Sequence, residues 1–308
     1  YNIHVKKQFF GYETGGIKLH APIDALIKNN LIHDNYRGIW LDWQSQGTRV
    51  SGNIFYNNEQ EDFFNEVNHG PMIVDNNIML SKTSILNASQ GTAHMHNLIT
   101  GKIIIRPVPN RFTPYHFAHS TSVKGLMTIL TGDDRYFNNI LTFNHNLKPY
   151  RGPAYDKVHS GLDAYNEHPL STDYWYKGNR PDDYANHKLP VYIASNLYYN
   201  KALPFNREKF GFESRTYSPK ISIEREGNAL FINLEVDNSF KEMNTKLITT
   251  NLMGTAFQSE EAFENNDSSP ISIDVDINGH QRYSKPTVGP FEKLKKGKNR
   301  IKIFTFNH

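Results

Sequence analysis

The feature that most constrains the fold is a repeat of little more than twenty residues in the first hundred positions. Four segments align: GIKLHAPIDALIKNNLI, GIWLDWQSQGTRVSGNIF, FFNEVNHGPMIVDNNIM and SILNASQGTAHMHNLI. Each contains a short apolar strand, a turn, a second strand and an asparagine before two apolar residues. This period is typical of one coil of a parallel β-solenoid, in which equivalent positions stack along the axis. The recurring asparagines are Asn30, Asn53, Asn77 and Asn97.

Asparagine is abundant, with 34 copies among 308 residues, and stacking explains its place in the repeat. An asparagine at the same bend of each coil can hydrogen-bond its counterparts above and below, and it tolerates the left-handed backbone of tight turns. Later copies at Asn139 and Asn196 predict that the coil continues. Period-two alternation favours this solenoid over helical leucine-rich repeats. We therefore predict an all-β chain with a parallel β-helix over residues 1–211.

Two regions depart from the repeat. Residues 144–190 are rich in Pro, Gly, Tyr, His and Asp and predict an irregular insertion that covers one face of the coil. From residue 212 onward, KISIEREGNALFINLEVD, ISIDVDINGHQR and NRIKIFTF alternate apolar and polar residues around Gly-Asn and Asn-Gly turns, which is typical of antiparallel hairpins. Residues 212–308 are therefore expected to form a β-sandwich beside the solenoid.

Composition narrows the classes of partner. Lys and Arg total 34 against 31 Asp and Glu, a net charge of +3 without a basic stripe, which argues against nucleic acid. No apolar run is long enough for a membrane span. The chain has no cysteine and no HExxH-like spacing, so we expect no metal or cofactor, and the compartment stays undetermined. The chain begins at Tyr1 rather than Met, so we expect a processed chain or a fragment.

The repeat alignment brings acidic residues of neighbouring coils into one column. Stacking IKLH on IWLD on FFNE aligns apolar first positions that face the core, so by alternation the second and fourth positions face outward. Asp42 lies 11 residues before Asn53, and Glu66 lies 11 residues before Asn77, which supports this register independently. The outward fourth column contains His20, Asp42 and Glu66.

Two carboxylates on adjacent coils suit the hydrolysis of a glycosidic bond. Parallel strands lie about 4.8 Å apart, close to the roughly 5 to 5.5 Å between the two carboxyls of retaining glycosidases. Proximity separates the two pKa values, so one carboxyl can stay ionised while the other keeps a proton for the leaving oxygen. The residues by themselves leave three alternatives open: solvated surface acids, a cation-dependent polysaccharide lyase, and a polysaccharide-binding β-helix without catalysis.

Aromatic and basic side chains lie near this pair in the alignment. Trp40 and Trp43 flank Asp42, and an outward aromatic ring is a platform for the face of a sugar. The basic side chains are candidates for binding sugar hydroxyls or for tuning the charge of the acids. They are Lys18, His20, Arg49 and His69.

The motifs GYETGGIKLHAPIDALI, GIWLDWQSQGTRVSGNIFYNN, FFNEVNHGPMIVDNNIMLS and GDDRYFNNI together resemble a known family. They are similar to the C-terminal half of glycoside hydrolase family 120, β-xylosidases with a right-handed parallel β-helix and an associated β-sandwich. The resemblance implies that Asp42, in WLDW, is the nucleophile and that Glu66, in NEVNHGP, is the general acid/base. It also implies that Glu13, in GYE, and Lys18, in GIKLH, bind the glycone.

The resemblance further implies an activity and a larger protein. The implied enzyme is an exo-acting retaining β-glycosidase, a β-xylosidase that releases xylose from xylo-oligosaccharides without a cofactor. A family member carries a further β-helix portion before the position of Tyr1, including part of the pocket, and we expect it to complete the site. The expected partner is an oligosaccharide substrate, and a homo-oligomer stays open.

Overall fold

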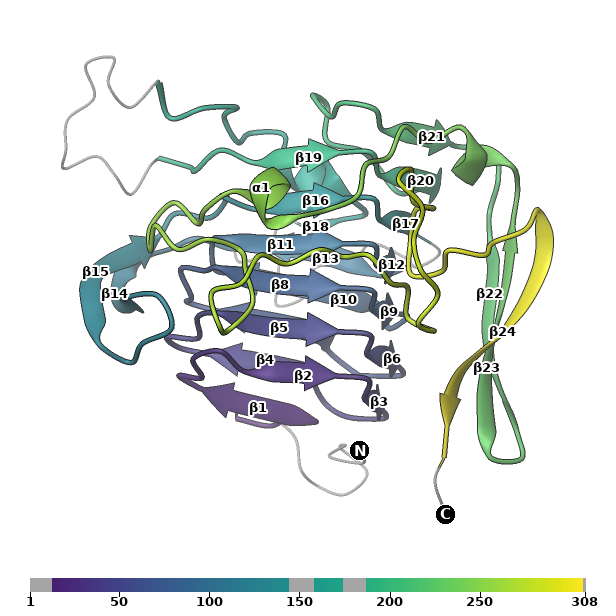
Figure 1. The fold of residues 1–308 in the computed structure, drawn as a ribbon, viewed down its shortest axis with the longest axis horizontal. Coiled ribbons are helices and arrows are strands. Elements are labelled where there is room, and N and C mark those ends of the chain that lie inside the picture. The colour runs from purple at the N-terminus through teal and green to yellow at the C-terminus, as the bar shows by residue number, and fades with distance from the viewer. Residues whose placement is uncertain (1–12, 144–157, 174–186, 307–308) are drawn as a thin grey trace.

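The chain folds into a right-handed parallel β-helix, with an antiparallel sheet and an irregular C-terminal segment against its sides (Figure 1). The structure, a computed structural model, describes residues 13–143, 158–173 and 187–306. Three sheets run along the axis, and a coil contributes one strand to each sheet. The predicted all-β class is confirmed. Among the described residues, no helix has the length and apolar character needed to cross a membrane.

Among the described residues, the three sheets of the β-helix contain nineteen strands, and neighbouring strands are parallel except for β13 and β18. The first sheet contains β1 (Ile17–His20), β4 (Ile39–Asp42), β7 (Glu61–Glu66), β10 (Thr83–Ala88), β13 (Lys102–Ile105) and β18 (Val158–His159). The second contains β2 (Leu26–Lys28), β5 (Thr48–Ser51), β8 (Met72–Asp75), β11 (Thr92–Met95), β16 (Arg135–Phe137) and β19 (Tyr192–Ala194). The third contains β3 (Leu31–His33), β6 (Ile54–Tyr56), β9 (Ile78–Met79), β12 (Leu98–Ile99), β17 (Ile140–Phe143), β20 (Leu197–Asn200) and β21 (Phe212–Ser214).

The register predicted for the first sheet is confirmed. His20 is the Cα partner of Asp42 across β1 and β4. Leu41 is the partner of Asn65 across β4 and β7, so the next residues of these two strands, Asp42 and Glu66, are neighbours on adjacent coils. The aligned apolar residues of the three strands pack inside the coil: Ile39 and Phe63 have no exposed surface, and Ile17 is partly buried against this core.

The predicted asparagine stack extends through six coils. From Asn53 onward, each amide oxygen accepts hydrogen bonds from both the backbone N–H and the side-chain amide of the preceding asparagine, at 2.9 to 3.1 Å. Five of the six are buried, so these bonds satisfy backbone groups that water cannot reach. The stack contains Asn30, Asn53, Asn77, Asn97, Asn139 and Asn196.

An antiparallel hairpin interrupts the coil after β13. It is formed by β14 (Val108–His116) and β15 (Val123–Ile129) and extends outward from the β-helix at one edge of the sheets (Figure 1). Its backbone is attached to the turns between the first and second sheets, because His69 and Gln46 hydrogen-bond to it. The hairpin therefore lies over the end of the strands that carry Asp42 and Glu66.

The predicted insertion at residues 144–190 falls in part outside the described residues, which leave out 144–157 and 174–186. Its described part contains β18 and a short 3₁₀ helix, Leu162–Tyr165. Leu162 and Tyr165 are fully buried and belong to the interior cluster of the β-helix. This part of the insertion therefore contributes to the core rather than covering an outer face.

The C-terminal part starts where the coil ends. β21 still pairs with β20, so the β-helix continues through Ser214, three residues beyond the expected boundary. The predicted hairpin KISIEREGNALFINLEVD is confirmed as β22 (Lys220–Glu226) and β23 (Ala229–Val236), and β24 (Gly297–Thr305) joins β23. This three-stranded antiparallel sheet packs one face on the third sheet of the β-helix, Leu230, Ile232 and Leu234 meeting Ile54 and Ile78. The described strands of this part thus form one antiparallel sheet, and the β-sandwich expected over residues 212–308 stays a prediction.

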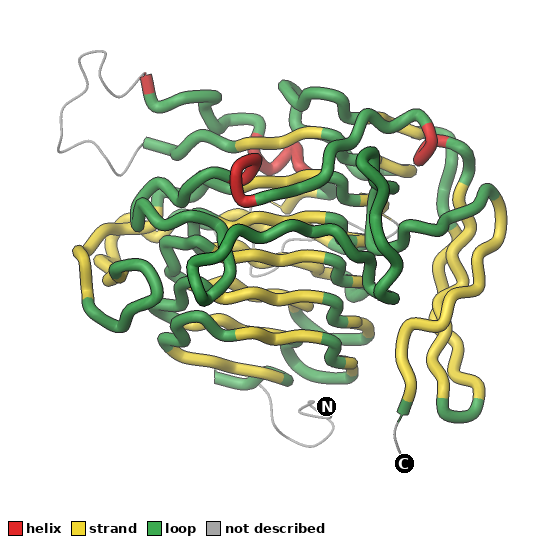
Figure 2. Tube along the Cα trace, viewed as in Figure 1, coloured by secondary structure: helices red, strands yellow, loops and turns green. Residues whose placement is uncertain are grey.

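Between β23 and β24 the chain follows an irregular path across the second sheet (Figure 2). It contains a short 3₁₀ helix, Ser239–Lys241, and α1, Thr250–Met253. Ile248, Phe263 and Ile273 of this segment pack on Ile73 and Met95, whose side chains point out of the β-helix. The hairpin expected at Asn278-Gly279 is a tight turn with a single bridge.

Candidate active site

The two predicted catalytic acids lie at the carboxyl ends of adjacent strands. Asp42 ends β4 and Glu66 ends β7, where the chain turns toward the second sheet. A second polar stack holds these turns in register: Asn68 accepts a hydrogen bond from the backbone N–H of Ser45 at 2.6 Å and donates to the carbonyl of Leu41 at 3.1 Å. Since strands of neighbouring coils are about 4.8 Å apart, the two carboxyls project side by side.

The environment of Asp42 favours a carboxylate. Its Oδ2 lies 2.9 Å from the Nζ of Lys18, and its Oδ1 accepts the backbone N–H of Trp43 at 2.7 Å. Burial acts to raise the pKa of Asp42, but the hydrogen bonds from Lys18 and Trp43, with the positive charge of Lys18 and of His20, outweigh it, so the pKa is lowered. Asp42 is 8% exposed, so its charge is only weakly screened by water.

The environment of Glu66 favours a protonated carboxyl. Burial raises its pKa, and the negative charge of Asp42 raises it further, against the weaker opposing effects of Arg111, Trp40 and Arg106. The indole N–H of Trp40 donates to Oε2 at 3.0 Å. The two neighbouring acids thus have pKa values displaced in opposite directions, the pattern that assigns the base and the acid of a catalytic pair.

Lys18 connects Asp42 with Glu13. Lys18 Nζ also binds the carboxylate of Glu13, which is largely exposed, and it lies 3.8 Å from the centroid of the Trp40 ring. Burial acts to lower the pKa of Lys18, but the two carboxylates outweigh it and raise the pKa. Lys18 is therefore a permanent cation in this site. Glu13 and Lys18, implied by the family resemblance, lie together with Asp42.

Trp40 is a support for the acid pair rather than a sugar platform. Only 5% of its surface is exposed, because Phe64 stacks on it at 5.2 Å and Lys18 and Arg37 lie over its ring. Its indole N–H orients Glu66. An open aromatic face is needed to stack on a sugar, so the role expected for Trp40 as a substrate-binding residue is corrected.

Trp43 and His20 lie at the rim of the acid pair. Trp43 is half-buried, and its ring is contacted by the His20 ring at 5.9 Å and by the guanidinium of Arg111 at 4.8 Å. His20 is exposed and lies beside Asp42 on the neighbouring coil. Their substrate-binding roles stay predictions.

His69 and Arg49 lie in structural positions. His69 is buried, its Nε2 donates to the carbonyls of Thr113 and Met127 at 3.0 and 3.1 Å, and its Nδ1 accepts from Gln90. Burial lowers the pKa of His69 to about 4, so the ring stays neutral. His69 holds the hairpin, and its expected substrate-binding role is corrected because both ring nitrogens are occupied. Arg49 forms a two-pronged ion pair with Asp75 on the second sheet.

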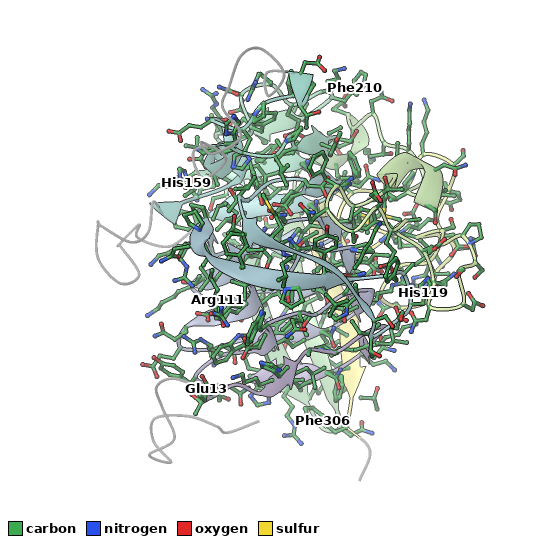
Figure 3. All side chains as sticks on the ribbon, turned by 90° about the vertical axis from the view of Figure 1, so that its left-hand side faces the viewer. Glu13, Arg111, His119, His159, Phe210 and Phe306 are labelled. Carbon is green, nitrogen blue, oxygen red and sulfur yellow. The ribbon has the colours of Figure 1, made fainter. Side chains whose placement is uncertain are left out.

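Arg111 is a site residue that the sequence analysis missed. It lies on β14, and its Nη1 is 3.8 Å from Oε1 of Glu66 while its guanidinium covers the Trp43 ring (Figure 3). Its side chain is 40% exposed, so it faces the open side of the acid pair. No repeat position corresponds to Arg111, because the hairpin is inserted between coils. No motif in residues 108–129 marks this side chain as part of the site.

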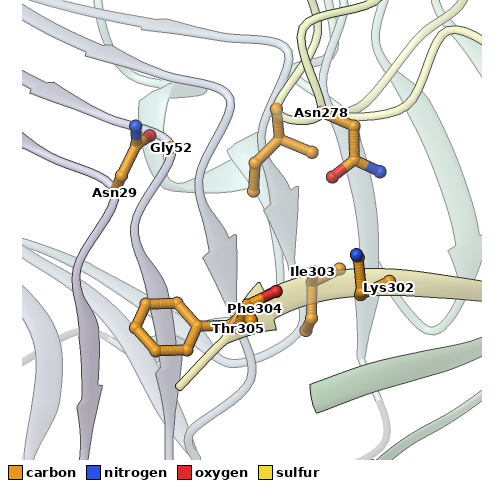
Figure 4. Close-up of a pocket in the computed structure, with 8 residues that line it drawn as sticks. Asn29, Gly52, Asn278, Lys302, Ile303, Phe304 and Thr305 are labelled. Carbon is orange, nitrogen blue, oxygen red and sulfur yellow. The ribbon is translucent and has the colours of Figure 1, made fainter. Parts of the chain in front are cut away.

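A hollow of about 330 Å³ lies on another side of the molecule (Figure 4). It is lined by Asn29 and Gly52, at the corner between the second and third sheets, and by Asn278, Lys302 and Phe304 of the C-terminal part. None of the residues that line it belongs to the first sheet, which carries both acids. The acid pair and this hollow are therefore separate features.

With this geometry, the chain falls in the class of right-handed β-helix proteins. A family model described as "Right handed beta helix region" matches residues 1–102. Among solved structures, the chain is similar to the one described as "The complex structure of XylC with xylose", with a TM-score of 0.89 and 38% sequence identity. The alignment covers 97% of this chain and 46% of that chain, so this chain spans about half the length of XylC. No curated protein matches the chain.

Proposed function

We propose that the protein is a retaining exo-β-glycosidase, a β-xylosidase that releases xylose from xylo-oligosaccharides. The observation that carries the proposal is the placement of Asp42 and Glu66 at the ends of adjacent strands, with Lys18 2.9 Å from Asp42. These contacts and the burial of Glu66 displace the two carboxyl pKa values in opposite directions, lowered for Asp42 and raised for Glu66. The similarity to XylC, a structure that contains xylose, supports a sugar of this class. The motifs quoted above support the finer assignment to glycoside hydrolase family 120 and to exo action.

In the proposed first step, a carboxylate oxygen of Asp42 attacks the anomeric carbon and the bond from that carbon to the leaving oxygen breaks. Glu66 gives its proton to the leaving oxygen, so the aglycone departs as a neutral alcohol. The lowered pKa of Asp42 suits a nucleophile, and the raised pKa of Glu66 suits a proton donor. The result is a covalent glycosyl-enzyme and a Glu66 carboxylate.

In the second step, the Glu66 carboxylate takes a proton from water, and the hydroxide oxygen bonds to the anomeric carbon. The bond to Asp42 breaks, and both acids return to their starting states. Two inversions at the same carbon give overall retention. No cofactor takes part in this sequence.

The charge of Lys18 supports hydrolysis over the lyase alternative. A lyase needs a basic group that removes a proton from the sugar. Lys18 is the amine nearest the acids among the described residues, and its pKa is raised by Glu13 and Asp42, so it keeps its proton. A permanently charged lysine stabilises the Asp42 carboxylate and is unsuited to proton abstraction.

The proposal is tested by comparing Asp42→Ala and Glu66→Ala on aryl β-xylosides. Without Asp42 no glycosyl-enzyme forms, so turnover of every substrate is lost. Without Glu66 an activated aryl group still departs unprotonated, so the glycosyl-enzyme forms and accumulates, and added azide releases it as a β-glycosyl azide. Glu59→Ala, an exposed acid on a neighbouring loop, is the matched control and keeps full activity. Azide rescue of neither variant, or normal turnover by either, would refute the assignment.

A further inference from the structure

Three segments far apart in the chain meet at a second cluster of titratable side chains. Asp24 lies in the turn before β2, His119 at the tip of the β14–β15 hairpin, and Glu261 in the irregular C-terminal segment. One oxygen or nitrogen atom from each lies within 4.8 Å of the others. His119 Nδ1 is 3.0 Å from Asp24 Oδ1 and 4.0 Å from Glu261 Oε1. Figure 3 shows the side chain of His119 beside the C-terminal segment.

The cluster holds more negative than positive charge. Glu264 Oε1 lies 3.4 Å from Nε2 of His119, so three carboxylates surround one imidazole. The Glu261 side chain is 1% exposed. One imidazolium compensates a single carboxylate, so the remaining charge favours a cation of higher charge at this place.

The two nitrogens of His119 have different partners. Nδ1 faces the Asp24 and Glu261 oxygens, while Nε2 faces Glu264 on the opposite side of the ring. A carboxylate that accepts the second ring N–H is the usual partner of a metal-binding histidine, because it fixes the tautomer and the ring orientation. Glu264 is placed to do this at Nε2, while Nδ1, within hydrogen-bond distance of Asp24, faces the other two carboxylates and can bind an ion once it has lost its proton.

Neighbouring residues hold these side chains in position. Gln46 is buried, donates to Oε2 of Glu261 at 2.6 Å and exchanges two hydrogen bonds with the backbone of His116 in the hairpin. Gly47 lies against Asp24, and a Cβ at this position would collide with Asp24 Oδ1. The ligand atoms are therefore held by the hairpin, the β-helix and the C-terminal segment together.

We propose that Asp24, His119 and Glu261 form a binding site for a divalent first-row cation with the preferences of Zn²⁺. Imidazole nitrogen and carboxylate oxygen are both ligands of this ion, and its tetrahedral geometry places ligand atoms roughly 3.3 Å apart. The present separations of 3.0 and 4.0 Å need only small side-chain rotations to reach this value. His119 releases its Nδ1 proton to solvent when the ion binds, and water takes the fourth position.

The ion crosslinks the β-helix, the hairpin tip and the C-terminal segment. The same hairpin carries Arg111 against Glu66, so the site stabilises the part of the chain that covers the acid pair. This inference depends only on the cluster and stands whether or not the chain is a glycosidase. Its test therefore uses binding and thermal stability rather than activity.

The test is a calorimetric titration of the chelator-treated protein with Zn²⁺, with the metal content measured after gel filtration. We expect one tightly bound ion per chain and a rise in Tm. His119→Gln and Glu261→Gln should each weaken this binding by at least about 10-fold, since loss of even an outer partner has an effect of that size. His33→Gln is the matched control, because His33 pairs with Asp34 at 2.6 Å without belonging to the cluster, and it should bind like the parent.

Glu264→Gln provides a second variant that leaves all three ligands in place. It should weaken Zn²⁺ binding by about 10-fold or more while its circular dichroism and its Tm without metal stay close to those of the parent. No tight site in the parent protein, or a tight site that survives in both His119→Gln and Glu261→Gln, would overturn the proposal. In either case the cluster is a proton-bridged ion pair alone.

Discussion

Replacing Asn77 by alanine removes the centre of the buried asparagine stack. Its Oδ1 accepts the backbone N–H and the side-chain amide of Asn53, at 2.9 and 3.1 Å. Its Nδ2 donates to the carbonyl of Val50 at 2.9 Å and to Oδ1 of Asn97 at 3.1 Å. The substitution therefore removes four hydrogen bonds at a position with no exposed surface.

Each such bond contributes about 1 kcal/mol net, so Asn77→Ala should lower the free energy of unfolding by about 4 kcal/mol. Water cannot replace the lost partners, because Asn53 and Asn97 are also buried. Asn30 is the matched control at the first described coil: its side chain donates two bonds, to Lys28 and Asn53, and is partly exposed. Asn30→Ala should cost about 1–2 kcal/mol.

The measurement is urea unfolding followed by circular dichroism, with the midpoint and the slope of each variant fitted separately. Because coils contact only their neighbours, loss of a central coil contact also separates the stack into two parts, so the Asn77→Ala transition should broaden. Equal midpoints for the two variants, or a loss below about 1.5 kcal/mol at Asn77, would refute the claim that the stack stabilises the fold through buried hydrogen bonds.

Three further predictions concern the acid pair. Lys18→Met removes the hydrogen bond and the charge that lower the pKa of Asp42. The acidic limb of the pH profile of kcat/KM on an aryl β-xyloside should therefore move to higher pH, and an unchanged limb would contradict the role given to Lys18. Arg111→Ala removes a cation that lowers the pKa of Glu66. On xylobiose, whose leaving group needs a proton, the alkaline limb of the pH profile of kcat/KM should therefore move to higher pH. Movement to lower pH would show that Arg111 does not lower the pKa of Glu66. Proton NMR in the first minutes of hydrolysis should detect the β-anomer of the released sugar. Carboxyls on adjacent coils at one register leave no room for the water of an inverting mechanism. An initial α-anomer would exclude Asp42 and Glu66 as the reacting pair.

The repeat explains why the fold was predictable from the sequence. In a parallel solenoid, each coil meets its neighbours at equivalent positions, so a sequence alignment of coils is also a spatial alignment. The spacing of Asn30, Asn53 and Asn77 therefore predicted the pairing of Asp42 with Glu66. The ends of β1 and β4 coincide with the predicted strands for the same reason.

Tertiary contacts between unlike segments had no such signal. Arg111 reaches Glu66 from an inserted hairpin, and His119 meets Asp24 from the tip of the same hairpin. Their positions depend on how the hairpin folds back over the turns, which no repeat register describes. The buried positions of Trp40 and His69 have a similar origin, because a strand pattern shows which side chains leave the coil but not what covers them.

The sequence by itself thus determined the coil, its register and the column of acids, since these follow from local alternation and a regular period. Only the tertiary structure decided the electrostatics that separate the two acids. Asp42 and Glu66 are both outward carboxylic acids in equivalent positions. Their pKa values are displaced in opposite directions because Asp42 contacts Lys18, whereas Glu66 is buried beside the negative charge of Asp42. Such differences depend on burial and on distances of a few ångströms between side chains.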